Sequence, residues 1–182
     1  MSEPLRIAVF GPESTGKTEL AAQLSAHYRA PLVAEYARER WDAQRGVLSL
    51  EDMLPIAKEQ WRREDAAAAG ARDLLICDTE ALTTMLWSDL LYGTSPDELR
   101  RGAEKRCRNY ALYLLLDTDV SFAPDPQRCF PEAEDRARCR RIWHGALERR
   151  GLPSAWIRGA WDERFRAAVA AIEALRAKSA AR

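Results

Sequence analysis

The chain has 182 residues, with 28 basic and 28 acidic side chains and a formal net charge of +0 at pH 7. This even balance gives no general attraction to nucleic acid or to an anionic membrane surface. No apolar run approaches the roughly 20 residues of a membrane-spanning helix, and no signal-peptide pattern opens the chain. We therefore expect a cytoplasmic protein that binds neither membrane nor nucleic acid, with a single domain over residues 1–182.

Short apolar runs alternate with helical patterns along the whole chain. In chain order, we expect a strand over 5–10, a helix over 17–28, a strand over 32–34, helices over 37–44 and 49–69, a strand over 74–77, helices over 79–91 and from 95, a strand over 110–116, a helix over 136–150, a strand over 155–158 and a helix over 161–178. Such alternation predicts an α/β fold with a five-stranded parallel sheet and helices on both faces.

Residues 117–135 interrupt this alternation. They include prolines at positions 124, 126 and 131, several acidic residues and no hydrophobic periodicity. We predict a mobile loop here. With the start of the following basic helix, it should form a small lid over about residues 117–140.

A glycine-rich phosphate-binding motif follows the first predicted strand. Residues 11–18 match G-x-x-x-x-G-K-[ST] at every fixed position, between an apolar strand and an amphipathic helix. The glycines let the backbone wrap around phosphate, Lys17 is expected to reach the β- and γ-phosphates, and the Thr18 hydroxyl is expected to bind Mg²⁺. The residues of this loop expected to contact ATP are Gly11, Glu13, Ser14, Thr15, Gly16, Lys17 and Thr18.

Three carboxylates stand at the carboxyl ends of predicted strands, where ligands bind in parallel sheets. Asp78 follows an apolar run, as a metal-orienting carboxylate does in this fold, although it could instead cap the next helix. Glu35 is a candidate general base for a substrate hydroxyl, and the alternative is an ion pair with a nearby arginine. For Asp117, neither a functional nor a structural role is favoured.

Arginines flank and follow the predicted lid. Kinases neutralise the charge of phosphoryl transfer with lid arginines, and lid closure keeps water from accepting the phosphoryl group. Arg128 is the first candidate for this role and Arg136 the second. Arg138, Arg140 and Arg141 fit a solvated helix face.

The four cysteines are irregularly spaced and form no paired motif. We expect free thiols. A zinc site at Cys129, Cys139 and His144 is the less favoured alternative, because structural zinc sites use tighter paired spacing.

These motifs together resemble the ribosylnicotinamide kinase domain of the NadR type, within the small P-loop AAA-like ATPases. The matching segments are 11–18, 35–39, 77–84 and the apolar run before Asp117, with Gln60, Asp125 and Arg128. The resemblance implies strand order 2-3-1-4-5 and ATP-dependent phosphorylation of the 5′-hydroxyl of nicotinamide riboside. It does not extend to the adenylyltransferase or DNA-binding domains of the full-length regulators.

The resemblance also implies roles for individual residues. Glu35, Tyr36 and Arg38 would line the riboside site, Asp78 and Glu80 would serve metal or ribose, and the loop at Gly159 would approach the adenine. Family members can carry an aromatic residue before the Glu-Tyr pair, where this chain has Ala34. Trp61, Trp87 and Tyr92 are candidates for a replacement ring, with core packing as the alternative.

Two other functions fit the same motifs. One keeps the kinase chemistry and changes the acceptor to another nucleoside or a small polyol. The other is an ATP-binding regulatory module without an acceptor.

Overall fold

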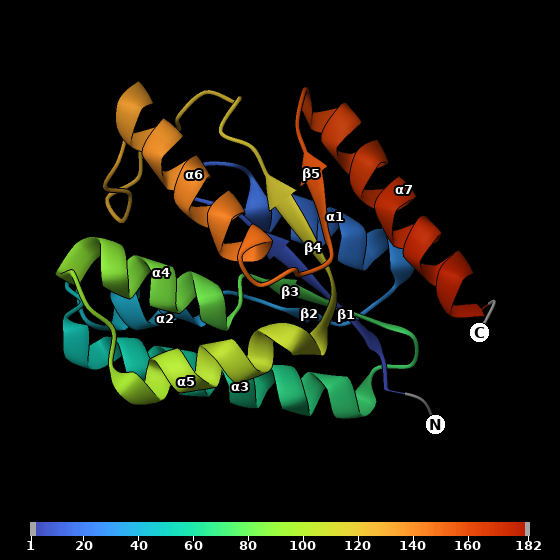
Figure 1. The fold of residues 1–182 in the computed structure, drawn as a ribbon, viewed down its shortest axis with the longest axis horizontal. Helices are drawn as coiled ribbons and strands as arrows, with labels where there is room; N and C mark the ends of the chain where they lie inside the picture. Colours follow the sequence, from blue (N-terminus) through green and yellow to red (C-terminus); the bar gives the residue numbers. More distant parts are fainter. Residues whose placement is uncertain (1–2, 181–182) are drawn as a thin grey trace.

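Five parallel strands form the centre of the fold in a computed structural model that describes residues 3–180 (Figure 1). The strands are β1 (Leu5–Phe10), β2 (Leu32–Val33), β3 (Leu74–Asp78), β4 (Tyr110–Leu116) and β5 (Ser154–Ile157). Their order in the sheet is β2-β3-β1-β4-β5, and every neighbouring pair is parallel. The predicted fold class and strand order are confirmed.

Helices connect the strands and cover both faces of the sheet (Figure 1). They are α1 (Lys17–Tyr28), α2 (Tyr36–Ala43), α3 (Leu50–Gly70), α4 (Ala81–Tyr92), α5 (Asp97–Arg106), α6 (Ala133–Glu148) and α7 (Trp161–Ala180), with a short 3-10 turn at Cys107–Asn109. Within residues 3–180, each helix is too short or too polar to cross a membrane.

The alternation of side chains along β1 divides the core into two layers. Ile7 and Val9 pack with residues of α1 and α7, whereas Ala8 and Phe10 pack with residues of α3, α4, α5 and α6. Successive strand residues point to opposite faces. The central strands are therefore mainly apolar on both faces, with Arg6 near the start of β1 and Asp78 at the end of β3 as charged exceptions, as expected for a sheet covered on both sides.

One helix start differs from the prediction in a way that affects the site. Thr79 has a left-handed φ of 68°, and its N–H donates to the Val9 carbonyl oxygen at 3.2 Å. Helix α4 therefore begins at Ala81 rather than at residue 79, and Glu80 is its N-cap residue. The alternative role of Asp78 as the cap of this helix is thus wrong.

The predicted lid also differs in detail. Helix α6 begins at Ala133, three residues before the predicted start at 136, with acidic side chains in its first turn. The residues before it form an irregular loop, and a turn closes where the Arg128 N–H donates to the Asp125 carbonyl oxygen at 2.9 Å.

Candidate active site

The phosphate-binding motif forms a tight loop between β1 and α1. Gly11 has a φ of +151°, and a Cβ there would lie 2.9 Å from the Leu116 carbonyl oxygen. Gly16 has a φ of +83° and is the N-cap residue of α1. Both positions therefore require glycine, one for close backbone approach and the other for its conformation.

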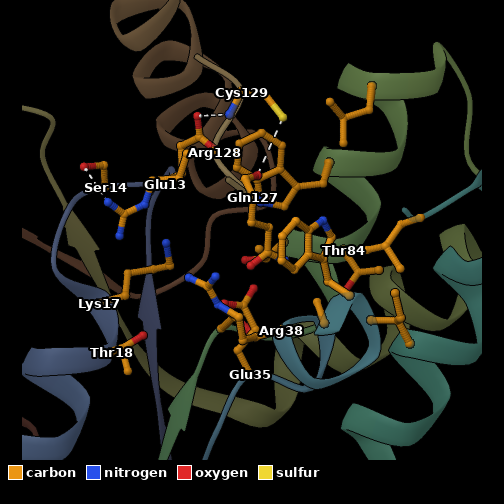
Figure 2. A pocket seen from close by; sticks show the side chains of 18 of the residues that line it. Glu13, Ser14, Lys17, Thr18, Glu35, Arg38, Thr84, Gln127, Arg128 and Cys129 are labelled. Atoms are coloured by element: carbon orange, nitrogen blue, oxygen red, sulfur yellow. Dashed lines mark hydrogen bonds between the residues drawn. The ribbon is translucent and has the colours of Figure 1, made fainter. Parts of the chain in front are cut away.

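Side chains within the loop hold its shape. The Thr15 hydroxyl is buried and donates to the Pro12 carbonyl oxygen at 2.9 Å. Lys17 Nζ donates to the same carbonyl oxygen at 2.8 Å and faces the cavity (Figure 2). The loop thus has the enclosed backbone and the lysine that a phosphate site needs.

Asp78 and Thr18 meet at the edge of this loop and fit a Mg²⁺ site. The Asp78 side chain is buried, and its Oδ1 has no hydrogen-bond partner among the described residues. Burial raises the pKa of Asp78, and the charge of Lys17 and a hydrogen bond with Thr18 partly offset this rise. A buried carboxylate oxygen without a partner, beside a hydroxyl, is the donor set that Mg²⁺ takes in phosphoryl-transfer sites.

Glu35 lies two residues after the end of β2, and it lines the same cavity as Lys17 (Figure 2). The pKa of Glu35 is raised, mainly by burial and further by the charge of Asp78. The charges of Lys17 and Arg38 partly offset this rise. The carboxyl ends of β2 and β3 therefore bring Glu35 and Asp78 into one electrostatic environment, with Lys17 as their shared cation.

The lid is joined directly to the phosphate-binding loop. Glu13 accepts hydrogen bonds from the backbone N–H groups of Cys129 and Phe130 at 2.9 and 2.6 Å. Ser14 Oγ accepts from the Ala123 N–H at 2.8 Å and from Arg128 Nη1 at 3.4 Å. These contacts join the lid to the phosphate-binding loop in this structure, and the mobility of the segment stays a prediction.

A second connection joins the lid to α2. Arg38 donates from Nη1 and Nη2 to the two carboxylate oxygens of Asp125, at 2.9 and 3.1 Å. Hydrogen bonding lowers the pKa of Asp125 to about 2. The larger effect comes from Arg38, and a smaller one comes from the Gln127 N–H. Asp125 is therefore ionised at any ordinary pH, and the lid is held at a point beside Glu35.

A cavity of about 650 Å³ extends from the phosphate-binding loop to α4. Side chains of the loop, α2 and the lid line its polar end, as Figure 2 shows for Lys17, Thr18, Glu35, Arg38 and Arg128. Its other end is mainly apolar and aromatic, and is lined by Trp41, Leu48, Met53, Ile56, Trp87, Leu91 and Tyr92.

Two of the candidate aromatic rings lie in this apolar end. Trp87 stacks on Phe130 of the lid, with ring centroids 6.1 Å apart and planes 9° apart. The Tyr92 hydroxyl donates to the Leu48 carbonyl oxygen at 2.9 Å. Trp61 instead packs against Gly102 of α5, so it does not replace the aromatic residue missing at Ala34.

Other predicted site residues lie outside the cavity. The ring of Tyr36 faces the Arg63 guanidinium at 4.5 Å, because α2 begins at Tyr36 and turns this side chain toward α3. The Glu80 carboxylate is buried and accepts from the N–H groups of Leu82 and Thr83. These placements do not support a substrate contact for Tyr36 or a metal or ribose contact for Glu80.

Arg136 and Gly159 have backbone contacts near the start of the lid. Arg136 Nη2 donates to the carbonyl oxygens of Thr118 and Val120 at 3.0 and 2.7 Å. The Gly159 N–H donates to Asp119 Oδ2 at 2.8 Å. Neither residue lines the main cavity, so contact of either with ATP stays a prediction.

Sequence reasoning gave no site role to several residues that line the cavity, among them one from α2 and one from α4. Trp41 of α2 and Thr84 of α4 both face it. Trp41 also lies 3.1 Å from the position of a Cβ on Gly46. Both fall within predicted helices. Thr84 ends the segment 77–84 that carries the resemblance, which implied no role for it, and no motif distinguishes Trp41. Among residues 3–180, no cluster of cysteine, histidine and carboxylates forms a metal site, so the less favoured zinc site has no support.

Comparison with family models gives one match, described as an AAA domain, over residues 6–164. The chain belongs to this family. Comparison with curated protein sequences gives no match.

Solved structures share the fold. NadR in complex with NR has a TM-score of 0.75 and 23% identity, and the match covers 94% of this chain and 51% of that chain. NadR in complex with NAD and AMP-PNP has a TM-score of 0.71 and 20% identity, covering 94% and 49%. Thymidylate kinase from Ehrlichia chaffeensis has a TM-score of 0.67 and 14% identity, covering 96% and 100%. The chain spans about half the length of the NadR structures.

Proposed function

We propose that this chain is an ATP-dependent kinase that phosphorylates the 5′-hydroxyl of nicotinamide riboside to give nicotinamide mononucleotide. One observation carries the proposal. A single cavity joins Lys17 and Thr18 of the phosphate-binding loop to Glu35 and Arg38, and then to an end lined by aromatic side chains. Such a cavity has room for a phosphate donor at one end and a nucleoside at the other.

The donor end would bind the triphosphate of ATP. Backbone N–H groups at the start of α1 and the Lys17 ammonium offset the negative charge of the phosphates. Thr18 and Asp78 would hold Mg²⁺, which, when bound, neutralises charge on the β- and γ-phosphates. Arg128 reaches the loop through Ser14, so its guanidinium can stabilise the charge that spreads over the transferred group.

The acceptor end would bind the riboside. Glu35 lines the same cavity as Lys17, so its carboxylate could accept the proton of a substrate hydroxyl as the oxygen attacks the donor phosphate. Glu35 is the N-cap residue of α2, and Arg38 in the first turn of this helix holds the lid through Asp125. Closure of the lid over the cavity would exclude water, which competes with the hydroxyl for the phosphoryl group.

The apolar end favours a nucleoside over a small polyol. Trp87 and Tyr92 line this end of the cavity, and aromatic rings pack favourably against planar partners such as a nucleoside base. Among proteins with this fold, one NadR structure holds NR, the usual abbreviation of nicotinamide riboside, and another holds AMP-PNP. These relatives support nicotinamide riboside as the first acceptor to test.

The test is an assay of ADP formation with Mg-ATP and a panel of acceptors. The panel should include nicotinamide riboside, thymidine, deoxyadenosine, uridine and glycerol, with Lys17→Ala as the inactive control. ADP formation that depends on nicotinamide riboside supports the proposal. If only another nucleoside supports ADP formation, the kinase activity stands and nicotinamide riboside is not its substrate. ADP formation that does not depend on an acceptor would support a regulatory ATPase.

A further inference from the structure

A buried arginine to which the proposed function gives no role lies behind the phosphate-binding loop. Arg164, in the first turn of α7, is 1% exposed and therefore among the most buried side chains of the protein. Its guanidinium faces the Trp161 ring, with 5.5 Å from Cζ to the ring centroid. Burying a charged group is costly unless it is paired and hydrogen-bonded. The partners of Arg164 therefore indicate its role.

Those partners come from three separate segments. Arg164 Nη1 donates to the Thr15 carbonyl oxygen at 3.1 Å, and Nη2 donates to the Asp117 carbonyl oxygen at 3.1 Å. Nε donates to the Gly159 carbonyl oxygen at 2.8 Å, and Nη2 also forms an ion pair with Asp119. One planar guanidinium thus joins the phosphate-binding loop, the start of the lid and the loop between β5 and α7.

The contact with Thr15 determines the direction of the next backbone N–H, that of Gly16. The described residues contain no cis peptide bond. In a trans peptide, the carbonyl oxygen and the following N–H point in opposite directions. Because the Thr15 carbonyl is held outward by Arg164, the Gly16 N–H is directed toward the interior of the loop. Within residues 3–180, that N–H has no backbone acceptor, which leaves it available for a ligand.

We propose that Arg164 is a positioning residue that directs the Gly16 N–H into the phosphate cradle and holds the cradle against the loop at Gly159. Asp119 completes this arrangement, because its Oδ1 pairs with Arg164 while its Oδ2 accepts from the Gly159 N–H. A lysine cannot reproduce the arrangement, since its single ammonium lacks the planar fork that reaches several acceptors at once. The inference rests on the proposed binding of ATP and is independent of the identity of the acceptor.

The test compares Arg164→Lys with Arg166→Lys on the same helix. Arg166 is exposed and forms an i,i+4 pair with Asp162, so it is a matched control outside the site. Dissociation constants would be measured by calorimetry for Mg-ATP and for Mg-tripolyphosphate, which lacks the base, without any acceptor. We expect the Kd of folded Arg164→Lys to be about 10- to 100-fold higher than that of the wild type for both ligands. Arg166→Lys should bind both as the wild type does.

Several results would overturn this role. Wild-type affinity for both ligands in a folded Arg164→Lys variant would overturn it. Weaker binding of ATP with unchanged binding of tripolyphosphate would also overturn it, because the effect would then lie at the adenine base and not at the phosphate cradle. If Arg164→Lys does not fold, Asp119→Asn provides the second test, because it keeps an oxygen acceptor for Gly159 and removes the charge beside Arg164. Weaker binding of both ligands by Asp119→Asn supports the proposal, and unchanged binding contradicts it. If the wild type itself binds neither ligand, the proposed function fails with it.

Discussion

Arg38 of α2 and Asp125 of the lid form a two-bond ion pair, with N–O distances of 2.9 and 3.1 Å. Paired planar groups of this kind combine charge attraction with a fixed geometry. The pair joins the acceptor side of the cavity to the lid, while Glu13 joins the lid to the phosphate-binding loop. In the proposed kinase, lid position and acceptor binding would therefore be coupled through these contacts.

Replacing Asp125 with asparagine tests this coupling. The variant keeps the shape of the side chain and removes its charge, so we expect kcat/KM for the acceptor to fall about tenfold, close to 1.4 kcal/mol of barrier. ATP hydrolysis without an acceptor should rise, because a looser lid admits water. Steady-state kinetics would measure both. Asp162→Asn is the control, since Asp162 pairs with Arg166 on the surface, and equal effects in the two variants would contradict the role of the lid.

Glu35→Gln tests the general base. Glutamine keeps the size of the side chain and cannot accept the proton, so we expect kcat to fall by about 10²- to 10⁴-fold. The Kd for ATP should stay close to the wild-type value, because Lys17 and the loop backbone are unchanged. Single-turnover kinetics and calorimetry separate the two quantities. Near-normal turnover in Glu35→Gln would remove this residue from the mechanism.

The pH dependence of activity should report the same group. Burial raises the pKa of Glu35 above its usual 4.5, and the base must be ionised to act. Activity should therefore be lost on acidification at a pH higher than an exposed glutamate would give. A profile of kcat/KM for the acceptor, compared with the residual profile of Glu35→Gln, shows whether the acidic limb belongs to this residue. An identical acidic limb in both proteins would assign it elsewhere.

Glu64 gives a prediction about stability. Burial raises its pKa to about 7, although hydrogen bonds from Tyr110 and Gln60 partly offset the rise. Since the folded-state pKa lies above the unfolded one, its contribution to stability is present at acidic pH and is lost as pH rises toward about 7. Urea unfolding of wild type and Glu64→Gln across this range should show a difference that changes by a few kcal/mol. A constant difference would contradict the raised pKa.

Gly16→Ala tests the contact between the loop and α7. A Cβ on Gly16 would clash with the ring of Trp161, and the φ of +83° is also unfavourable for alanine. We expect weak ATP binding and a lower melting temperature. Trp161→Ala in the same chain should restore part of both, leaving the left-handed backbone cost of about 1–2 kcal/mol. If the double variant is no better than Gly16→Ala, the ring is not the cause.

The sequence predicted what depends on local patterns. Apolar runs identify the strands, and the spacing within residues 11–18 identifies the phosphate-binding loop, because neighbouring residues alone determine both. The resemblance over residues 77–84 predicts a site role for Glu80. The positive φ of Thr79 instead moves the helix start and turns Glu80 into its cap. Arg164 has no local signal at all, since its contact at Thr15 lies 149 residues away in the chain.

The most direct test of the proposed function identifies the product that carries the γ-phosphate of ATP. The protein would be incubated with Mg-ATP and nicotinamide riboside, and the products followed by phosphorus NMR, with Lys17→Ala as the control. We expect ADP together with an equal amount of a phosphate monoester on the 5′-oxygen of the riboside. Free orthophosphate with unchanged riboside would contradict it.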